Sequence, residues 1–133
     1  ANPLYLKALA EAEFKSGNIV SALEAYMELC ELEPDDADNW ADWSLIYYEQ
    51  GDIENAMAIV EGGLNQLPDD TTLLYRKVVY QITEGDYKAA FNTLELALIL
   101  DFEGHQVLFD FFPNANTQKA LFKIIEQYRK NKG

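Results

Sequence analysis

The tripeptide Gly51-Asp52-Ile53 decides the fold of this chain, because the same pattern occurs 34 residues earlier and 34 residues later. The earlier copy is Gly17-Asn18-Ile19 and the later copy is Gly85-Asp86-Tyr87, so each glycine precedes a short polar residue and a bulky apolar one. Alanines and prolines keep the same spacing: Ala22, Ala56, Ala90, Pro34 and Pro68. A fixed period of about 34 residues is typical of helical hairpins that stack into an array. The sequence therefore predicts an all-α solenoid.

Each 34-residue unit contains the signals of two helices joined by a tight turn. Glycine ends the first helix because it adopts positive φ without a Cβ clash. The next residue, Asn18, Asp52 or Asp86, suits the N-cap of the second helix, where a side-chain oxygen accepts backbone N–H groups. Apolar residues at steps of three and four mark the buried face of each helix. The expected helices cover residues 4–15, 19–32, 37–49, 53–66, 71–83 and 87–100.

The period ends at Gly104, and the remaining residues have a different character. We expect a short helix over residues 105–111 and a last amphipathic helix that Asn116 or Thr117 caps and that runs to about residue 130. Such a helix covers the apolar face that the last hairpin of a solenoid leaves open. Docking onto a partner or a second copy is the alternative use of this tail. The expected organisation is three repeats, 3–36, 37–70 and 71–104, followed by a capping segment, 105–133.

The net charge of −13 over 133 residues is unevenly distributed. Residues 37–70 carry eight acidic and no basic residues, whereas residues 105–133 carry five basic and two acidic ones. A field this negative repels phosphate backbones, so we expect no nucleic acid among the partners and favour basic ones. No apolar run approaches the roughly 18 residues of a membrane span. We expect a cytoplasmic protein without a membrane segment; its start at Ala1 is compatible with a fragment of a longer array or with a missing leader.

The sequence shows no set of residues that would carry out catalysis. Cys30 is the only cysteine, which excludes an internal disulfide, and its place in an apolar helix predicts a small buried thiol. His105 is the only histidine, and the nearby carboxylates match no metal motif, so a capping or surface histidine is expected. There is no glycine-rich loop for phosphate, and Gly62-Gly63 lies inside a helix, where it indicates close packing. We therefore expect no enzyme, no cofactor and no metal.

At these positions the chain resembles the tetratricopeptide repeat family over residues 3–104. The second unit is the nearest match, with Trp40-Ala41-Asp42-Trp43-Ser44, Tyr47, Gly51-Asp52, Ala56 and Pro68. The first unit supplies Leu9-Ala10, Gly17-Asn18, Ala22, Tyr26, Leu32 and Pro34, and the third supplies Gly85-Asp86-Tyr87, Ala90, Leu94, Ala97 and Leu100. The resemblance implies antiparallel helix pairs in a right-handed superhelix. It also implies a concave groove that the first helices line and in which family members bind an extended peptide or a partner helix.

The resemblance also assigns positions of this sequence to the groove. We take as candidate peptide-binding residues Lys7, Glu11, Asp38, Asp42, Leu45, Tyr48, Glu49, Tyr75, Arg76 and Val79. One subfamily binds the C-terminal carboxylate of chaperones with a Lys, Asn, Asn, Lys, Arg set. Lys7 and Arg76 match this set in phase, but Glu11, Asp42 and Thr72 replace the two Asn residues and the second Lys. Two acids facing a carboxylate repel it by about 1 kcal/mol each, which argues against that activity.

The leading hypothesis is a protein-interaction scaffold that holds a basic or mixed apolar-basic peptide, or a partner helix, in its groove. A second hypothesis is structural self-association, in which the first hairpin, the groove or the aromatic tail packs against a second copy. A third is that the chain belongs to a longer repeat array in a multi-domain adaptor, whose binding surface lies in other repeats.

Overall fold

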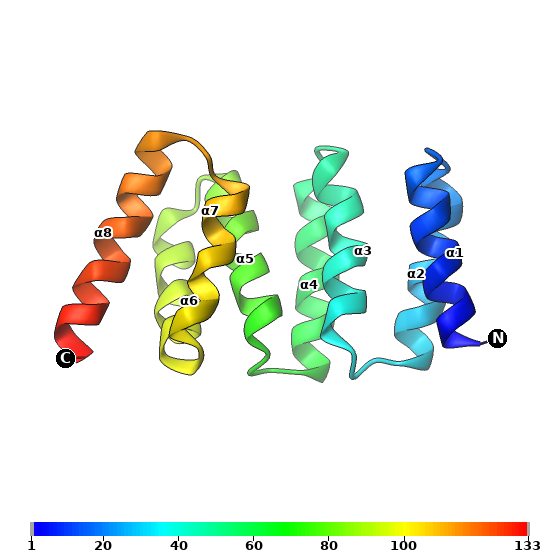
Figure 1. Ribbon diagram of the computed structural model, residues 1–133, viewed down its shortest axis with the longest axis horizontal. Coiled ribbons are helices and arrows are strands. Elements are labelled where there is room, and N and C mark those ends of the chain that lie inside the picture. Colours follow the sequence, from blue (N-terminus) through cyan, green and yellow to red (C-terminus); the bar gives the residue numbers. More distant parts are fainter. Residues whose placement is uncertain (1, 133) are drawn as a thin grey trace.

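A computed structural model describes residues 2–132, in which helices follow one another without a strand. The first six helices form three hairpins that stand side by side along the long axis of the molecule (Figure 1). The expected bounds of the second, third, fourth and sixth helices are confirmed, and those of the other two differ by one residue. The six helices are α1 Pro3–Lys15, α2 Ile19–Leu32, α3 Ala37–Glu49, α4 Ile53–Gln66, α5 Thr71–Glu84 and α6 Tyr87–Leu100.

The turn inside each hairpin forms as the repeated tripeptide predicts. Gly17, Gly51 and Gly85 have φ of 82°, 79° and 83°, in the left-handed region that glycine adopts without strain. The Asp52 side chain accepts a hydrogen bond from the Asn55 N–H at 3.1 Å, and Asp86 caps α6 in the same way. Asn18 occupies the corresponding position of α2, but its side chain makes no capping hydrogen bond, so that part of the prediction is wrong.

Small residues allow the helices of the array to approach closely. The repeated alanines Ala22, Ala56 and Ala90 are fully buried. At Gly63, an added Cβ would lie 2.8 Å from Cγ of Trp40 and 2.9 Å from Cδ1 of Leu73. This position therefore accepts no side chain without a shift of its neighbours, which agrees with the close packing expected inside α4.

The tail forms three helical segments, because the short helix expected over residues 105–111 is split into a 3₁₀ turn and an α-helix. It begins with the 3₁₀ helix η1, Phe102–Gln106, continues into the short α7, Val107–Phe111, and ends with α8, Ala115–Lys132. Both η1 and α7 contact α5, and α8 contacts α6 at the C-terminal end of the array (Figure 1). The expected cap of the last helix is wrong by two residues, because Oδ1 of Asn114 accepts the hydrogen bond from the Asn116 N–H at 2.9 Å. Asn114 follows Pro113 directly, so the capping residue lies in the short connection between α7 and α8.

None of the helices in the described part of the chain has the length and hydropathy that a bilayer crossing requires.

Candidate binding groove

The surface formed by α1, α3, α5 and α7, which we call the first-helix face, carries the candidate residues. In Figure 1, α1, α3 and α7 lie on the near side of the molecule, in front of the second helices. The helices α3 and α5 contact each other, and so do α5 and α7, which makes the face continuous over the second half of the chain. Every residue that we assigned to the groove belongs to α1, α3 or α5.

Asp42 of α3 is the electrostatic centre of this face. Its carboxyl is half-buried, and burial is the main reason that its pKa is raised above the usual value of an aspartate. The cations Lys7 and Arg76 lower this pKa, whereas Asp38 and Glu11 raise it further. Four charged groups from α1, α3 and α5 therefore lie within electrostatic range of Asp42, and two of them are carboxylates.

The Asp42 carboxylate has no hydrogen bond and no ion pair within 4.0 Å among the side chains that the structure describes. A half-buried charge is normally paired, because burial removes part of its hydration. Asp42 keeps neither full hydration nor a partner. The site is therefore suited to a cationic group that approaches from solvent.

Arg76 is already engaged by the protein and does not neutralise Asp42 directly. Its Nη1 donates a hydrogen bond to the carbonyl oxygen of Ala41 at 3.1 Å. Its guanidinium carbon lies 5.0 Å from the ring centroid of Phe111, a cation–π distance. These two contacts hold the guanidinium between α3 and α7, where it forms part of the first-helix face.

Three apolar residues of the predicted site serve mainly as packing. Tyr75 is 2% exposed, and its hydroxyl donates a hydrogen bond to the carbonyl oxygen of Asp101 at 2.6 Å. Val79 is fully buried. Tyr48 stacks on Tyr80 with ring centroids 5.3 Å apart and remains half-buried. Because the side chains of Tyr75 and Val79 are buried, both residues shape the floor of the face. Of the other predicted residues on α3, Leu45 is half-buried and Glu49 is exposed.

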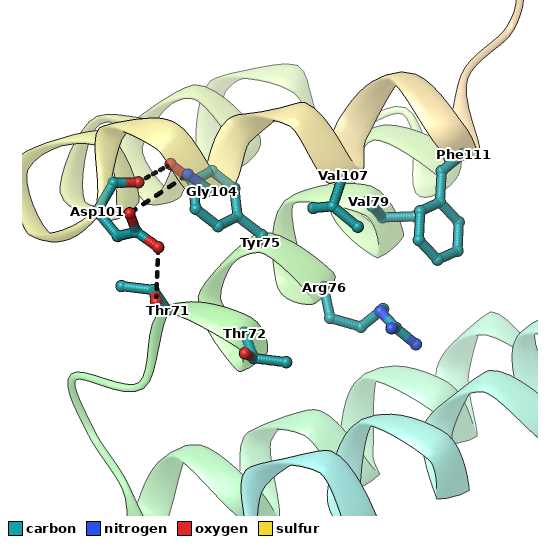
Figure 2. A pocket seen from close by; sticks show the side chains of 9 residues that line it. All are labelled: Thr71, Thr72, Tyr75, Arg76, Val79, Asp101, Gly104, Val107 and Phe111. Carbon is teal, nitrogen blue, oxygen red and sulfur yellow. Dashed lines mark hydrogen bonds between the residues drawn. The ribbon is translucent and has the colours of Figure 1, made fainter.

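A pocket of about 140 Å³ opens where α5 meets η1 and α7 (Figure 2). Its apolar lining comes from Tyr75, Val79, Val107 and Phe111, and its polar lining comes from Thr71, Thr72, Arg76 and Asp101. Gly104 completes the pocket: a Cβ there would lie 2.8 Å from Cε2 of Tyr75, so the η1 backbone lies directly against the tyrosine ring. The volume suits one apolar side chain of an incoming peptide.

Phe111 also lines this pocket, although the sequence pattern does not assign it to the site. The Phe111 ring packs edge-on against Tyr48 at 5.7 Å between centroids and lies beneath the Arg76 guanidinium. The only signal in the sequence is the apolar cluster over residues 108–112, which indicates a buried face but not which repeat it contacts. In the structure α7 follows η1 directly and contacts α5, which places Phe111 beside Arg76.

Cys30 and His105 both have buried side chains that pack inside the protein. Cys30 is buried, as expected, and burial raises the pKa of its thiol to about 12, so it stays protonated at neutral pH. His105 is 3% exposed and contacts Phe102 and Phe109, so of the two expected roles, a capping or a surface histidine, the surface position is wrong. No group of three His, Cys, Asp or Glu side chains that could hold a metal ion occurs among residues 2–132.

No protein-family model and no curated protein matches the sequence. Solved structures match its fold. The TPR2B domain of yeast Sti1, in complex with pHsp70, aligns with a TM-score of 0.68 at 20% identity and covers 95% of this chain and 97% of that one. The first TPR of Spaghetti (RPAP3), bound to the HSP90 peptide SRMEEVD, aligns with a TM-score of 0.69 at 16% identity over 96% and 95%. The Sgt2 TPR domain from Aspergillus fumigatus gives 0.68 and 17% over 98% and 82%. The chain therefore has the tetratricopeptide-repeat fold, an all-α solenoid, as the resemblance implies.

Proposed function

Because the chain has a tetratricopeptide-repeat fold, we propose that it is a non-enzymatic protein-interaction module that holds an extended peptide on its first-helix face. The peptide carries a Lys or Arg next to an apolar residue. Solved structures of the same fold support the general part of this proposal, because two of them contain a bound chaperone peptide or complex. The charge and shape of this chain's own residues support the more specific part.

The unpaired carboxylate of Asp42 is the observation that carries the proposal. A peptide ammonium or guanidinium that reaches Asp42 restores the hydrogen bonds that burial has removed, and Glu11 and Asp38 add attraction at longer range. Among the described groups that act on Asp42, the cations are Lys7 and Arg76, and Arg76 also donates a hydrogen bond to the Ala41 carbonyl oxygen. The positive charge near Asp42 therefore offsets only part of the negative charge of the three carboxylates. The site therefore retains negative potential for a basic ligand.

The pocket beside Arg76 supplies the apolar half of the recognition. Arg76 influences the pKa of Asp42 and also lines the pocket, so the acidic site and the apolar pocket are neighbours. A side chain that fills the pocket lies beside Arg76, so the adjacent peptide residue lies near the Asp42 carboxylate. A basic residue next to an apolar one in an extended peptide matches this arrangement.

Acidic C-terminal peptides fit the same surface poorly. The peptide SRMEEVD, which the solved first TPR of Spaghetti (RPAP3) binds, carries two glutamates and ends in an aspartate. Glu11 and Asp42 of this chain would face those groups, and each like-charge contact costs about 1 kcal/mol at partly solvated range. We propose that this chain selects against such peptides.

Isothermal titration calorimetry with matched peptides tests the proposal. The first peptide carries a Lys flanked by Leu residues, the second carries Glu in place of that Lys, and the third is SRMEEVD. We expect the Lys peptide to bind best, and Asp42→Asn to weaken its binding about tenfold, which corresponds to 1.4 kcal/mol. The control is Glu95→Gln, which removes an exposed carboxylate from the second helix α6 and leaves binding unchanged.

Two results would contradict the proposal. One is equal or tighter binding of the Glu peptide or SRMEEVD. The other is an equal loss of affinity in Asp42→Asn and Glu95→Gln, because that would indicate a general effect of net charge rather than a site at Asp42.

A further inference from the structure

The first hairpin presents an acidic groove at the N-terminal end of the solenoid. This groove of about 300 Å³ lies between α1 and α2, with Leu6, Leu9 and Ala25 as its apolar lining. Glu13, Glu24 and Glu28 line it as well, and no basic residue does. Tyr5 stands one helical turn before Leu9 on α1 and is 64% exposed, so it extends the apolar part towards the start of the helix. At the inner junctions α2 packs on α3 and α4 packs on α5, but no described helix packs on this end.

The last helix presents the complementary surface at the other end. The outward face of α8 forms a shallow groove lined by Phe122, Lys123 and Lys130, and Phe122 is 58% exposed. Lys119 lies one turn before Lys123 on the same face and is exposed. The one acidic residue of this surface, Glu126, is already neutralised, because Nη1 of Arg129 lies 2.7 Å from its carboxylate. Three lysines therefore flank one aromatic side chain.

The two surfaces match in charge and in the placement of their apolar groups. The N-terminal groove has three carboxylates around an apolar floor, and the α8 face has three ammonium groups around an exposed phenylalanine. They lie at opposite ends of the molecule (Figure 1), so one chain cannot bring them together itself. We propose that the α8 face of one copy packs into the α1–α2 groove of a second copy, with Phe122 on the apolar floor and the lysines against the glutamates.

This contact is head-to-tail and extends the stacking that the chain already uses internally. A heterologous contact between two different surfaces leaves one free surface at each end of the dimer, so further copies add to it. Because the attraction comes largely from exposed charges, it weakens as salt screens them. None of the candidate peptide-binding residues lines either surface, so self-association and peptide binding are separable.

Sedimentation velocity on the full chain tests the proposal with two charge reversals. The groove variant is Glu24→Lys/Glu28→Lys, the α8 variant is Lys123→Glu/Lys130→Glu, and the combined variant carries all four changes and keeps the net charge of −13. In low salt the wild type is expected to grow beyond its monomer mass of 15.1 kDa as concentration rises. Each single-surface variant is expected to associate about tenfold more weakly. The combined variant regains association, because its reversed surfaces again attract each other.

Circular dichroism checks that every variant is folded before the comparison is made. Three results would overturn the proposal. The first is a wild type that stays monomeric up to about 1 mM in low salt, the range of the weakest specific contacts. The second is a single-surface variant that associates as well as the wild type. The third is a folded combined variant that stays monomeric, because charge complementarity between these two surfaces would then not be the cause.

Discussion

The three regular hairpins and the tail from Asp101 onward both pack helices against the preceding repeat, but they use different residues at the contacts. In the hairpins, small residues at fixed positions let helices approach, as Ala56 and Gly63 do. In the tail, aromatic rings make the contacts: Phe102 stacks on Tyr128 at 5.9 Å, and Phe111 packs against Tyr48 at 5.7 Å. In the regular region α5 contacts both helices of the preceding hairpin, α3 and α4, whereas in the tail η1 and α7 contact α5 and α8 contacts α6.

The tail lacks the repeat signature, yet its helices still stack on the last hairpin of the array. The signature produces regular hairpins that bury small residues at the same position of each repeat. The aromatic tail instead produces one specific interface, and that interface builds half of the pocket on the first-helix face through Val107 and Phe111. We infer that the irregular segment, rather than the regular repeats, gives the candidate site its individual shape.

Removal of an aromatic ring from the tail should have the largest effect. The Phe102 ring contacts His105 and Tyr128 and lies under the Arg129 guanidinium, so Phe102→Ala leaves a cavity where η1 meets α8. We expect a loss of about 3 kcal/mol in the free energy of unfolding, at the low end for buried aromatic residues. Urea denaturation measures it. Phe122→Ala, on the exposed face of α8, is the matched control and should change stability by less than about 0.5 kcal/mol. Equal effects of the two substitutions would show that α8 is not held by its aromatic contacts.

Addition of a methyl group in the regular region should have the next largest effect. A Cβ at Gly63 meets Trp40 and Leu73 below 3.0 Å, whereas at Gly62 the nearest atom is Cζ3 of Trp40 at 3.2 Å. Overpacking should cost Gly63→Ala about 2 kcal/mol after the gain in helix propensity, and Gly62→Ala should be close to neutral. Thermal unfolding followed by circular dichroism distinguishes the two. If Gly63→Ala is as stable as Gly62→Ala, the close approach of helices in the repeats is not essential.

Asp42 is the exception within the regular region, and its effect on stability should be the smallest and opposite in sign. Burial raises the pKa of Asp42 in the folded state, so ionisation is less favourable there than in the unfolded chain. At pH 7 the charge therefore costs stability, and Asp42→Asn should be more stable than the wild type. The difference should shrink as pH falls through the folded-state pKa and vanish below the unfolded value, about 3.9. Urea denaturation at several pH values tests this, and a destabilised Asp42→Asn at pH 7 would show that Asp42 is a paired structural charge.

The sequence predicts the regular region more completely than the tail. Glycine at positive φ and the aspartate caps are local requirements, so a period of 34 residues locates the first six helices to within one residue. The tail has no period, and the 3₁₀ start at Phe102 depends on the fit of Gly104 against the Tyr75 ring, a contact between residues far apart in sequence. For the same reason the sequence pattern does not assign Phe111 to the candidate site, and it includes Tyr75, which the structure buries.

A nuclear magnetic resonance titration tests the central claim most directly. The ¹⁵N-labelled chain is titrated with the peptide that carries a Lys flanked by Leu residues, at a concentration where the chain alone is monomeric. The account predicts amide shift changes along α3, α5 and α7 that centre on Asp42 and include Phe111, and their loss in Asp42→Asn. Shift changes confined to the second helices α2, α4 and α6, or unchanged by Asp42→Asn, would contradict it.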